Sequence, residues 1–281
     1  MVWIDACAQQ IMSATILARM AEEILGREEY IYELAAEAGN LAAFVNENMW
    51  DGKTGFYYDL RNDGLSGVKT IASYWALAAQ TVPDDRAEKF VSHLFREDEF
   101  FRAHAPATLS ADDPDYHPRG GYWRGSVWAP TTYMALRALD SYGMYDKARV
   151  LAKNHHSAVV KVFEDTGTFW ENYAPDYIAR GESGMTDFVG WSGLPPIAVF
   201  LEYIIGIRPH GKDHMIEWRV GETARHGVEN YPVGRDSVVD LVCEARANTN
   251  ERPRITAKTV SGEPIKIKVI WSGGEYELIS E

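Results

Sequence analysis

The stretch Ile4–Gly26, which reads IDACAQQIMSATILARMAEEILG, decides the fold class of the first part of the chain. Its apolar residues recur at intervals of three and four and form one stripe along a helix: Ile4, Ala8, Ile11, Met12, Ile16, Met20 and Ile24. Gly26 follows, and glycine is the residue type that most readily ends a helix. The stretch is therefore predicted to be an amphipathic helix.

Six further stretches show the same periodicity up to residue 206. They cover residues 30–49, 69–80, 84–96, 129–142, 144–163 and 194–205. Gly143 and Gly206 follow two of them as stop signals. The sequence therefore predicts seven helices and a mainly α-helical fold.

Beyond Pro209 the apolar residues alternate with a period of two, which is typical of strands. The alternating stretches are 216–220, 238–243, 255–259 and 265–271. Glycine and proline turns separate them, so four or five short strands are expected to form a small antiparallel β-sandwich. The chain is thus expected to comprise an α-helical domain over residues 1–206 and a β-sandwich domain over residues 207–281.

The composition excludes several classes of protein. The 281 residues include 28 Lys and Arg but 41 Asp and Glu, and the net charge of −13 repels nucleic acid and anionic lipid surfaces. Two cysteines are too few for a disulfide scaffold, and the longest apolar run, residues 194–201, is too short to cross a bilayer. With no basic leader before a cleavage site, the chain is expected to be cytoplasmic, with neither nucleic acid nor membrane as a partner.

Two hexapeptides form an internal repeat. Residues 54–59 (TGFYYD) and 166–171 (TGTFWE) align without gaps, and each follows a predicted helix. Repetition of helix pairs with equivalent loops favours a helical toroid. Equivalent loops of a toroid emerge on one rim, so Asp59 and Glu171 are predicted to lie on the same face.

The segment 122–128 (YWRGSVW) places three aromatic side chains and one cation just before a predicted helix. A guanidinium set among tryptophans is held by a carboxylate, a stacked ring or the oxygens of a ligand. Trp123, Arg124 and Trp128 are therefore candidates for binding a ligand. The alternative is that the tryptophans pack the helix entry while the arginine is solvated.

The segment 169–173 (FWENY) brackets an acid with aromatic rings in a loop. Glu171 lies between Trp170 and Tyr173, in surroundings that suit a carboxylate for general base catalysis. The two bracketing rings, Trp170 and Tyr173, are candidates for binding the substrate. The alternative is a solvated loop glutamate.

The segment 187–193 (DFVGWSG) combines an acid and a tryptophan with glycines that let the backbone approach a ligand. Asp187 and Trp191 are its candidate residues, and the alternative is a turn that caps the next helix. His104 and His117 lie before the 122–128 segment and are weaker candidates to line the same site, since a histidine is often solvated.

Three motifs in these segments resemble, in order and spacing, those of the (α/α)6-barrel, or six-hairpin, glycosidases of glycoside hydrolase family 63 and its mannosylglycerate and glucosylglycerate hydrolase relatives. Trehalases are similar more distantly. The motifs are Trp123-Arg124-Gly125-x-x-Trp128, Trp170-Glu171-Asn172-Tyr173 and Gly190-Trp191-Ser192-Gly193. The resemblance covers residues 1–206 and implies that this part is a portion of such a toroid.

The resemblance also implies a chemistry, which is inverting hydrolysis of an α-glycoside without a metal or other cofactor. Glu171 matches the general base that activates water. Trp123, Arg124 and Trp128 match residues that line the sugar subsite, and Asp187 and Trp191 lie in the matching glycine-rich segment. The expected ligand is a short saccharide or the glycoside of a small acid.

One element of the resemblance is missing. In the family, the general acid is an Asp that precedes a helix beginning Val/Ile-Asp, and residues 2–5 (VWID) resemble that start. The acid is therefore expected before Met1, unless Asp5 or Asp59 replaces it. Since twelve helices make a six-hairpin barrel and seven are predicted, the chain is expected to be a C-terminal part with exposed apolar faces, which favour a homo-oligomer.

Two other functions stay open on the sequence. The first is a catalytically inactive protein that binds a sugar or another partner on the same scaffold. The second is a magnesium-dependent isoprenoid enzyme, suggested by the acid cluster of residues 110–115 (SADDPD). Pro114 argues against it, because it breaks the helix on which such metal ligands would lie.

Overall fold

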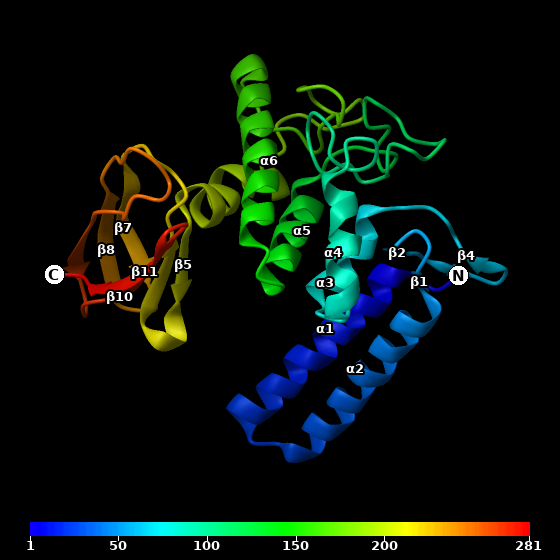
Figure 1. Ribbon diagram of the computed structural model, residues 1–281, viewed down its shortest axis with the longest axis horizontal. Coiled ribbons are helices and arrows are strands. Elements are labelled where there is room, and N and C mark those ends of the chain that lie inside the picture. Colours follow the sequence, from blue (N-terminus) through cyan, green and yellow to red (C-terminus); the bar gives the residue numbers. More distant parts are fainter. The chain divides into compact units, whose positions relative to one another are not determined.

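The computed structural model describes residues 1–281 and divides into two compact units, Met1–Leu194 and Pro195–Glu281 (Figure 1). The first unit contains most of the helices, and the second contains one long helix followed by two β-sheets. None of the helices combines the length and the apolar composition that a membrane-spanning segment needs.

The seven predicted helices are all present. The main helices of the first unit are α1 (Ile4–Met20), α2 (Glu28–Asn48), α3 (Trp75–Ala78), α4 (Asp84–Ser92), α5 (Ala129–Ser141) and α6 (Tyr145–Thr166). Shorter turns of helix extend or connect them: η1 (Ala21–Leu25), η2 (Ile71–Tyr74), η3 (His93–Phe95) and η4 (Trp191–Gly193). The seventh is η5 (Pro195–Ile205), which belongs to the second unit. Closure of the helices into a toroid stays a prediction.

The boundary between the units differs from the expected one at residue 206, because η5 groups with the strands. Its last residue, Ile205, belongs to the hydrophobic core of the second unit, and Phe200 packs against that core. Burial of apolar side chains therefore explains why this helix lies with the second unit.

The α1 and α2 helices form an antiparallel hairpin (Figure 1). The buried face of α1 consists of Ile4, Ala8, Ile11, Ala14 and Ala18. Three residues of the predicted stripe, Ile16, Met20 and Ile24, are instead at least 46% exposed. The prediction was wrong in this half of the stripe, because small alanines form the buried face there.

Apolar side chains are exposed where this hairpin turns. Besides the three just named, they are Leu17, Leu25, Tyr30 and Tyr32. Gly26 follows η1 with a left-handed φ of +59°, and so ends this helical stretch as predicted. Association of copies through such a surface stays a prediction.

Two short hairpins between α2 and α3 were not predicted, because strands of two residues carry no periodic signal. Strand β1 (Trp50–Asp51) pairs with β2 (Phe56–Tyr57), and β3 (Leu60–Arg61) pairs with β4 (Gly64–Leu65). The rings of Phe56 and Tyr57 are fully buried. The first repeat hexapeptide therefore lies in the core of the first unit.

A buried ionic network lies beneath this hexapeptide. Lys69 and His93 each donate to the carboxylate of Glu99 at 2.5 Å, and the other ring nitrogen of His93 lies 3.1 Å from the carbonyl oxygen of Thr54. Lys69 also pairs with Asp112. An acid of the 110–115 cluster is therefore part of a structural ion pair.

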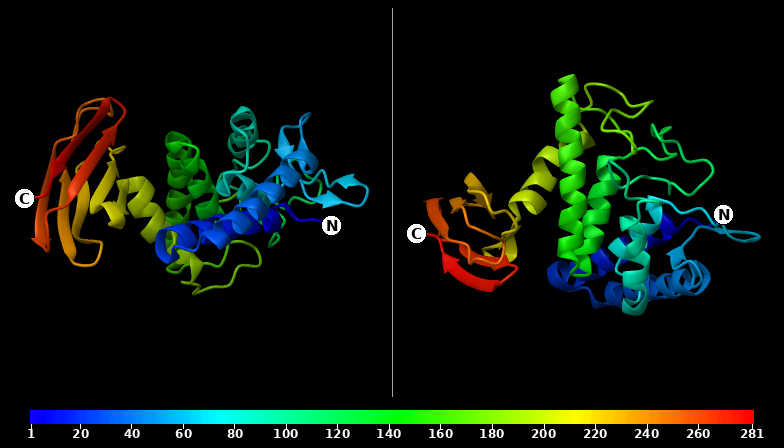
Figure 2. Two further views of the ribbon diagram at one scale, coloured as in Figure 1. Left: turned by 90° about the horizontal axis from the view of Figure 1, so that it is seen from below. Right: turned by 45° about the horizontal axis from the view of Figure 1, so that its top comes forward.

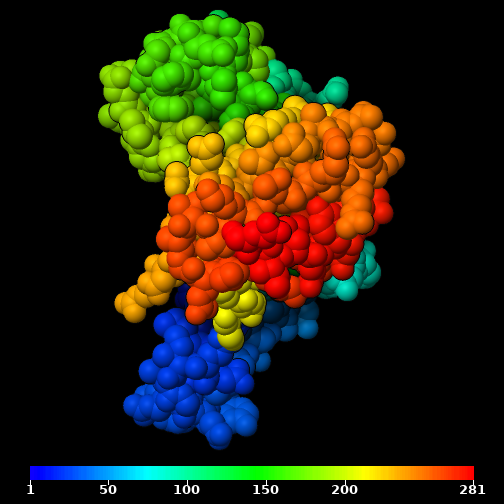
Figure 3. Space-filling view, turned by 90° about the vertical axis from the view of Figure 1, so that its left-hand side faces the viewer, coloured from blue at the N-terminus to red at the C-terminus, as the bar shows by residue number.

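The second unit contains two sheets. One has the order β11-β10-β6-β5 and the other the order β7-β8-β9. The strands are β5 (Ile207–His210), β6 (Met215–Arg219), β7 (His226–Val233), β8 (Ser237–Cys243), β9 (Ile255–Ser261), β10 (Lys266–Trp271) and β11 (Gly274–Ile279). In the space-filling view of Figure 3, the red carboxyl-terminal residues of this unit lie beside orange residues that precede them in the chain.

Two expectations for this unit need correction. It has seven strands and not four or five, and β6 pairs with β10 in parallel, so it is not wholly antiparallel. Parallel neighbours need a long crossover, and the chain between these two strands supplies it by forming the three-stranded sheet. Both sheets contribute buried residues to one core, with Trp218 and Ile267 from one and Leu241 from the other.

Candidate active site

The three segments singled out in the sequence lie together. Helices α5 and α6 run side by side and antiparallel (Figure 2), which brings the segment before α5 and the segment after α6 to the same end of the pair. Val127 and Tyr173 join these segments through two backbone hydrogen bonds of 2.8 and 3.0 Å. The third segment joins them through Trp191, whose indole nitrogen donates to the carbonyl oxygen of Glu171 at 2.9 Å.

The carboxylate of Glu171 lies at the centre of this cluster and is held without a cation. Glu171 is 6% exposed. The hydroxyl of Tyr122 donates to Oε1 at 3.4 Å, and the backbone N–H of Met185 donates to Oε2 at 3.4 Å. Both bonds are long, so the oxygens keep the capacity to accept a stronger hydrogen bond, such as one from a water molecule.

Tryptophan rings form a platform beside this carboxylate. Trp123 and Trp128 stack with ring centroids 4.4 Å apart and an interplanar angle of 5°, and the ring of Trp191 lies 5.7 Å from that of Trp128. Trp128 is buried at the start of α5, whereas Trp123 is 54% exposed and Trp191 is 37% exposed. The platform thus offers apolar ring surface of the kind on which the C–H face of a sugar packs.

Tyr122 is the residue that the sequence reasoning missed. Its φ of +65° lies in the left-handed region, where a bulky residue costs about 1–3 kcal/mol. This conformation directs its hydroxyl to Glu171, and Trp128 donates to its carbonyl oxygen at 3.4 Å. Tyr122 belongs to an aromatic segment, and this could have identified it as a candidate. Its left-handed backbone could not have been predicted from the sequence, apart from the two glycines, Gly120 and Gly121, that precede it.

Arg124 is exposed and has no carboxylate partner. Its side chain lies against Gly121, where a Cβ atom would be 3.2 Å from two guanidinium nitrogens, so glycine makes room for it. Two more arginines of these loops are exposed and unpaired with an acid. Arg119 lies over the ring of Tyr177, and Arg180 lies over a tryptophan ring. In a chain of net charge −13, these loops therefore carry free positive charge.

Trp170 and Asp187 lie at the edge of the cluster. Trp170 is half-buried beneath Arg180, 4.9 Å away, and its indole nitrogen donates to Thr166 Oγ1 at 3.1 Å. Asp187 is exposed and accepts a hydrogen bond of 2.8 Å from Thr168. These contacts tie the third segment to the end of α6.

Tyr173 lies beneath the loop and not on its surface. It is 1% exposed and belongs to a core cluster with Val127, Val159 and Val162. Its ring centroid lies 5.3 Å from that of His104. In this position Tyr173 supports the loop that carries Glu171.

His104 lies in the core and does not line the site. His104 Nε2 and His155 Nδ1 are 2.8 Å apart, and both side chains are fully buried. Burial holds the pKa of His104 well below its usual value and lowers the pKa of His155 to about 3. Both rings are therefore neutral near pH 7. His117 lies nearer the surface, 3.5 Å from Glu182.

The two acids considered as replacements for the general acid both serve the start of α1. Asp59 Oδ1 accepts a hydrogen bond of 2.9 Å from the backbone N–H of Ile4, and Asp5 Oδ1 accepts one of 2.8 Å from Ala6. Neither carboxylate hydrogen-bonds to the three segments. No group of three His, Cys, Asp or Glu side chains is arranged to hold a metal ion.

Comparison with known proteins confirms the predicted resemblance to glycoside hydrolase family 63 and its relatives. Residues 4–191 match the family described as the mannosylglycerate hydrolase MGH1-like glycoside hydrolase domain. The mannosylglycerate hydrolase of Rubrobacter radiotolerans is 24% identical over 209 residues, which cover 69% of this chain and 44% of that protein. The probable mannosyl-oligosaccharide glucosidase of Schizosaccharomyces pombe is 27% identical over 192 residues, which cover 61% of this chain and 23% of that protein.

A solved structure is also similar to this chain. The GH63 mannosylglycerate hydrolase of Thermus thermophilus, in complex with Tris and D-glycerate, has a TM-score of 0.56 and 26% identity, over 70% of this chain and 45% of that one. The chain spans about half the length, or less, of the curated relatives that it matches.

Proposed function

The chain belongs to the mannosylglycerate hydrolase MGH1-like glycoside hydrolase family, and we propose that it acts in the inverting hydrolysis of an α-glucosidic or α-mannosidic bond, with Glu171 as the general base. The observation that carries this proposal is the Glu171 carboxylate itself. It is 6% exposed, pairs with no cation and is held between a tyrosine hydroxyl and a backbone N–H, beside a tryptophan platform.

In this mechanism Glu171 accepts a proton from a water molecule as that water attacks the anomeric carbon. Inverting enzymes place the base and the acid about 6.5–9.5 Å apart, which leaves room for the water. Tyr122 and Met185 each donate to one carboxylate oxygen, so they orient the carboxylate, while Trp191 fixes the backbone of the base. Trp123 presents an exposed ring on which the sugar packs.

The free arginines support a substrate that carries a carboxylate. Arg124, Arg119 and Arg180 are exposed, and none is neutralised by an acid of the chain. A guanidinium recognises a carboxylate with two parallel hydrogen bonds. We therefore propose a glycoside of a small acid as the substrate, and the D-glycerate bound by the Thermus thermophilus relative is consistent with this chemistry.

The proton donor is assigned to neither Asp5 nor Asp59, because both carboxylates accept backbone hydrogen bonds at the start of α1. An α-glycosyl fluoride has a leaving group that needs no protonation. Its hydrolysis therefore reports on the base alone, whichever group donates the proton to natural glycosides.

The test is turnover of α-glucosyl and α-mannosyl fluoride by the full chain, with the anomeric form of the product followed by NMR. We expect the inverted, β-configured sugar, and a loss of about 10²- to 10⁴-fold in Glu171→Gln. Glu164→Gln is the matched control, because Glu164 is an exposed residue at the end of α6 and should leave the rate unchanged.

Three results would change the assignment. Retention of configuration would exclude the inverting mechanism. Fluoride turnover that survives Glu171→Gln would exclude this base. Saccharide binding without turnover of either fluoride would favour the alternative of an inactive sugar-binding protein.

A further inference from the structure

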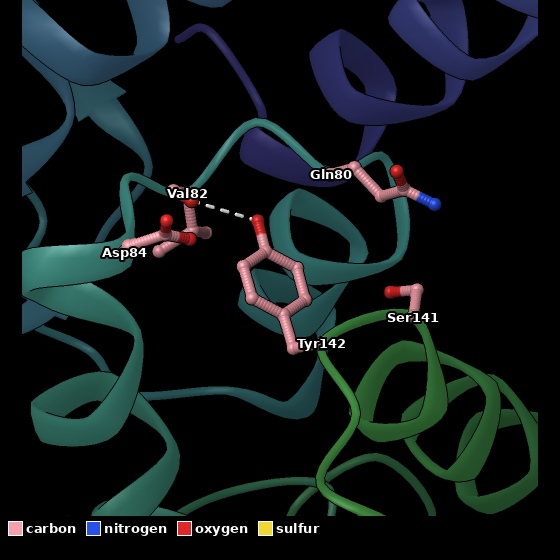
Figure 4. A pocket seen from close by; sticks show the side chains of 5 residues that line it. All are labelled: Gln80, Val82, Asp84, Ser141 and Tyr142. Carbon is pink, nitrogen blue, oxygen red and sulfur yellow. Dashed lines mark hydrogen bonds between the residues drawn. The ribbon is translucent and has the colours of Figure 1, made fainter.

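A polar pocket lies in the first unit, away from the three segments of the candidate active site. It has a volume of about 360 Å³ and is lined by Gln80, Val82, Asp84, Ser141 and Tyr142 (Figure 4). The last two residues end α5, whereas the tryptophan platform lies at the beginning of the same helix. At 1.5 Å per residue, the 13-residue helix separates the two places by about 20 Å.

Gln80 holds a strained conformation at this pocket. The N–H of Gln80 donates to Leu77 and that of Thr81 donates to Ala76, which together form the Schellman motif at the end of α3. Gln80 has a φ of +56° and occupies the left-handed position of this motif, where glycine is normally found. The side-chain amide of Gln80 makes no hydrogen bond within the chain. Its NH2 group is therefore a free donor and its oxygen a free acceptor at the pocket.

The other polar groups of the pocket also keep capacity for a ligand. Asp84, the first residue of α4, is exposed and pairs with no cation. Ser141 Oγ donates to the carbonyl oxygen of Ala138 at 2.8 Å and keeps lone pairs that can accept. Tyr142 donates to the carbonyl oxygen of Val82 at 2.7 Å, which fixes its ring as a wall of the pocket.

Figure 4 shows how these groups surround the ring. Gln80 and Ser141 lie on one side of Tyr142, and Asp84 and Val82 lie on the other. A small molecule that packs on the ring would reach an amide and a hydroxyl at one edge and a carboxylate at the other. This set of donors and acceptors is suited to a small molecule that carries several hydroxyl groups.

We propose that this pocket is a second binding site, which takes a neutral polyol of the size of one sugar ring. An anion is excluded because the carboxylate of Asp84 would repel it, and the lining contains no cation. A divalent metal ion is disfavoured because the pocket offers a single carboxylate. The site is independent of the proposed hydrolysis, since it shares no residue with the platform or with Glu171.

The experiment follows the side-chain amide signal of Gln80 by ¹⁵N NMR of the full chain, titrated with methyl α-D-glucoside and methyl α-D-mannoside. The signal is assigned by its loss in Gln80→Gly. We expect at least one of the two sugars to give a saturable shift, and the same shift in Trp123→Ala, which removes the exposed ring of the platform. Ethylammonium at the same concentration should leave the signal unmoved.

Binding of the sugar should weaken at least tenfold in Asp84→Ala and in Gln80→Gly. Because Gln80→Gly lacks the amide signal, its binding is measured by calorimetry in a chain that also carries Trp123→Ala. Gln80→Gly should unfold at the same or a higher temperature than the parent, because glycine relieves the left-handed strain, so its loss of binding does not reflect misfolding. The proposal is overturned if neither sugar shifts the signal up to 100 mM, if ethylammonium shifts it as strongly, or if Asp84→Ala binds as tightly as the parent. None of these outcomes depends on whether the chain hydrolyses a fluoride.

Discussion

The two repeat hexapeptides, 54–59 and 166–171, begin with the same turn, but the acids at their ends make different contacts. Gly55 has a φ of +76° and donates to Asp51 at 2.7 Å, and Gly167 has a φ of +73° and donates to Phe163 at 2.7 Å. Each glycine therefore closes a turn to the residue four positions earlier. The shared Thr-Gly specifies this local geometry in both places.

After the glycine the two loops diverge. The first buries its aromatic residues completely, in β2, and its acid Asp59 caps α1. The second leaves Phe169 and Trp170 half-exposed, and its acid Glu171 faces the hydroxyl of Tyr122. The comparison indicates that the repeated motif fixes a turn, whereas the elements that pack around it decide whether its acid contacts the start of a helix, as Asp59 does, or faces the hydroxyl of Tyr122, as Glu171 does.

The largest effect on stability is expected from the buried ring of the first loop. Phe56→Ala removes a fully buried phenyl ring and should lower the free energy of unfolding by about 3–5 kcal/mol. The equivalent change in the second loop, Phe169→Ala, removes a half-buried ring and should cost about 1 kcal/mol. Urea unfolding of both variants tests the comparison, and equal losses would show that the two loops do not differ in this way.

The next effect concerns the ionic network under the first loop. Burial alone raises the pKa of Glu99, but the hydrogen bonds from His93 and Lys69 outweigh it, so the pKa of Glu99 lies below its usual value. A carboxyl of this kind stabilises the fold above its unfolded pKa of about 4.3, and the contribution is lost as pH falls through the lower folded value.

Glu99→Gln should therefore cost about 3 kcal/mol at pH 7, the low end for a broken buried pair because Asp112 still pairs with Lys69. It should also flatten the loss of stability between pH 5 and pH 3. Urea midpoints measured at several pH values check both points. A parent chain whose stability does not fall on acidification would contradict the assignment of an ionised Glu99.

A smaller effect is expected at the second loop, where Tyr122 contacts Glu171, the proposed base. Tyr122→Phe removes one long hydrogen bond to the Glu171 carboxylate and should reduce fluoride turnover by about tenfold, the lower end for a hydrogen bond to a charged group. Tyr177→Phe is the control, because Tyr177 is exposed and does not contact the base. Unchanged turnover in Tyr122→Phe would mean that this hydroxyl does not orient the carboxylate.

The sequence predicted where the long helices lie because an apolar periodicity runs through each of them, although the predicted stripe matched the buried face of α1 only in its first half. The sequence did not predict elements that are too short to show a periodicity, or pairings between segments far apart in the chain. Strands β1 and β2 have two residues each, and the parallel pairing of β6 with β10 depends on strands far apart in the chain.

The candidate site shows the same division. Glu171 could be predicted because it is an acid between aromatic residues, and the platform could be predicted from its tryptophans. In both cases the residue types alone indicate a binding site. The left-handed backbone of Tyr122 and the buried contact of His104 with His155 depend on packing between segments, so no local pattern predicted them.

The central claim is that Glu171 is a base and that its counterpart Asp59 is a helix cap. The measurement that tests it most directly is the rate of α-glycosyl fluoride hydrolysis and the thermal unfolding midpoint, both determined for Glu171→Gln and Asp59→Ala. We predict that Glu171→Gln loses about 10²- to 10⁴-fold in rate while keeping its midpoint, whereas Asp59→Ala loses about 1 kcal/mol of stability and keeps its rate. A rate that falls in Asp59→Ala but survives in Glu171→Gln would contradict the account.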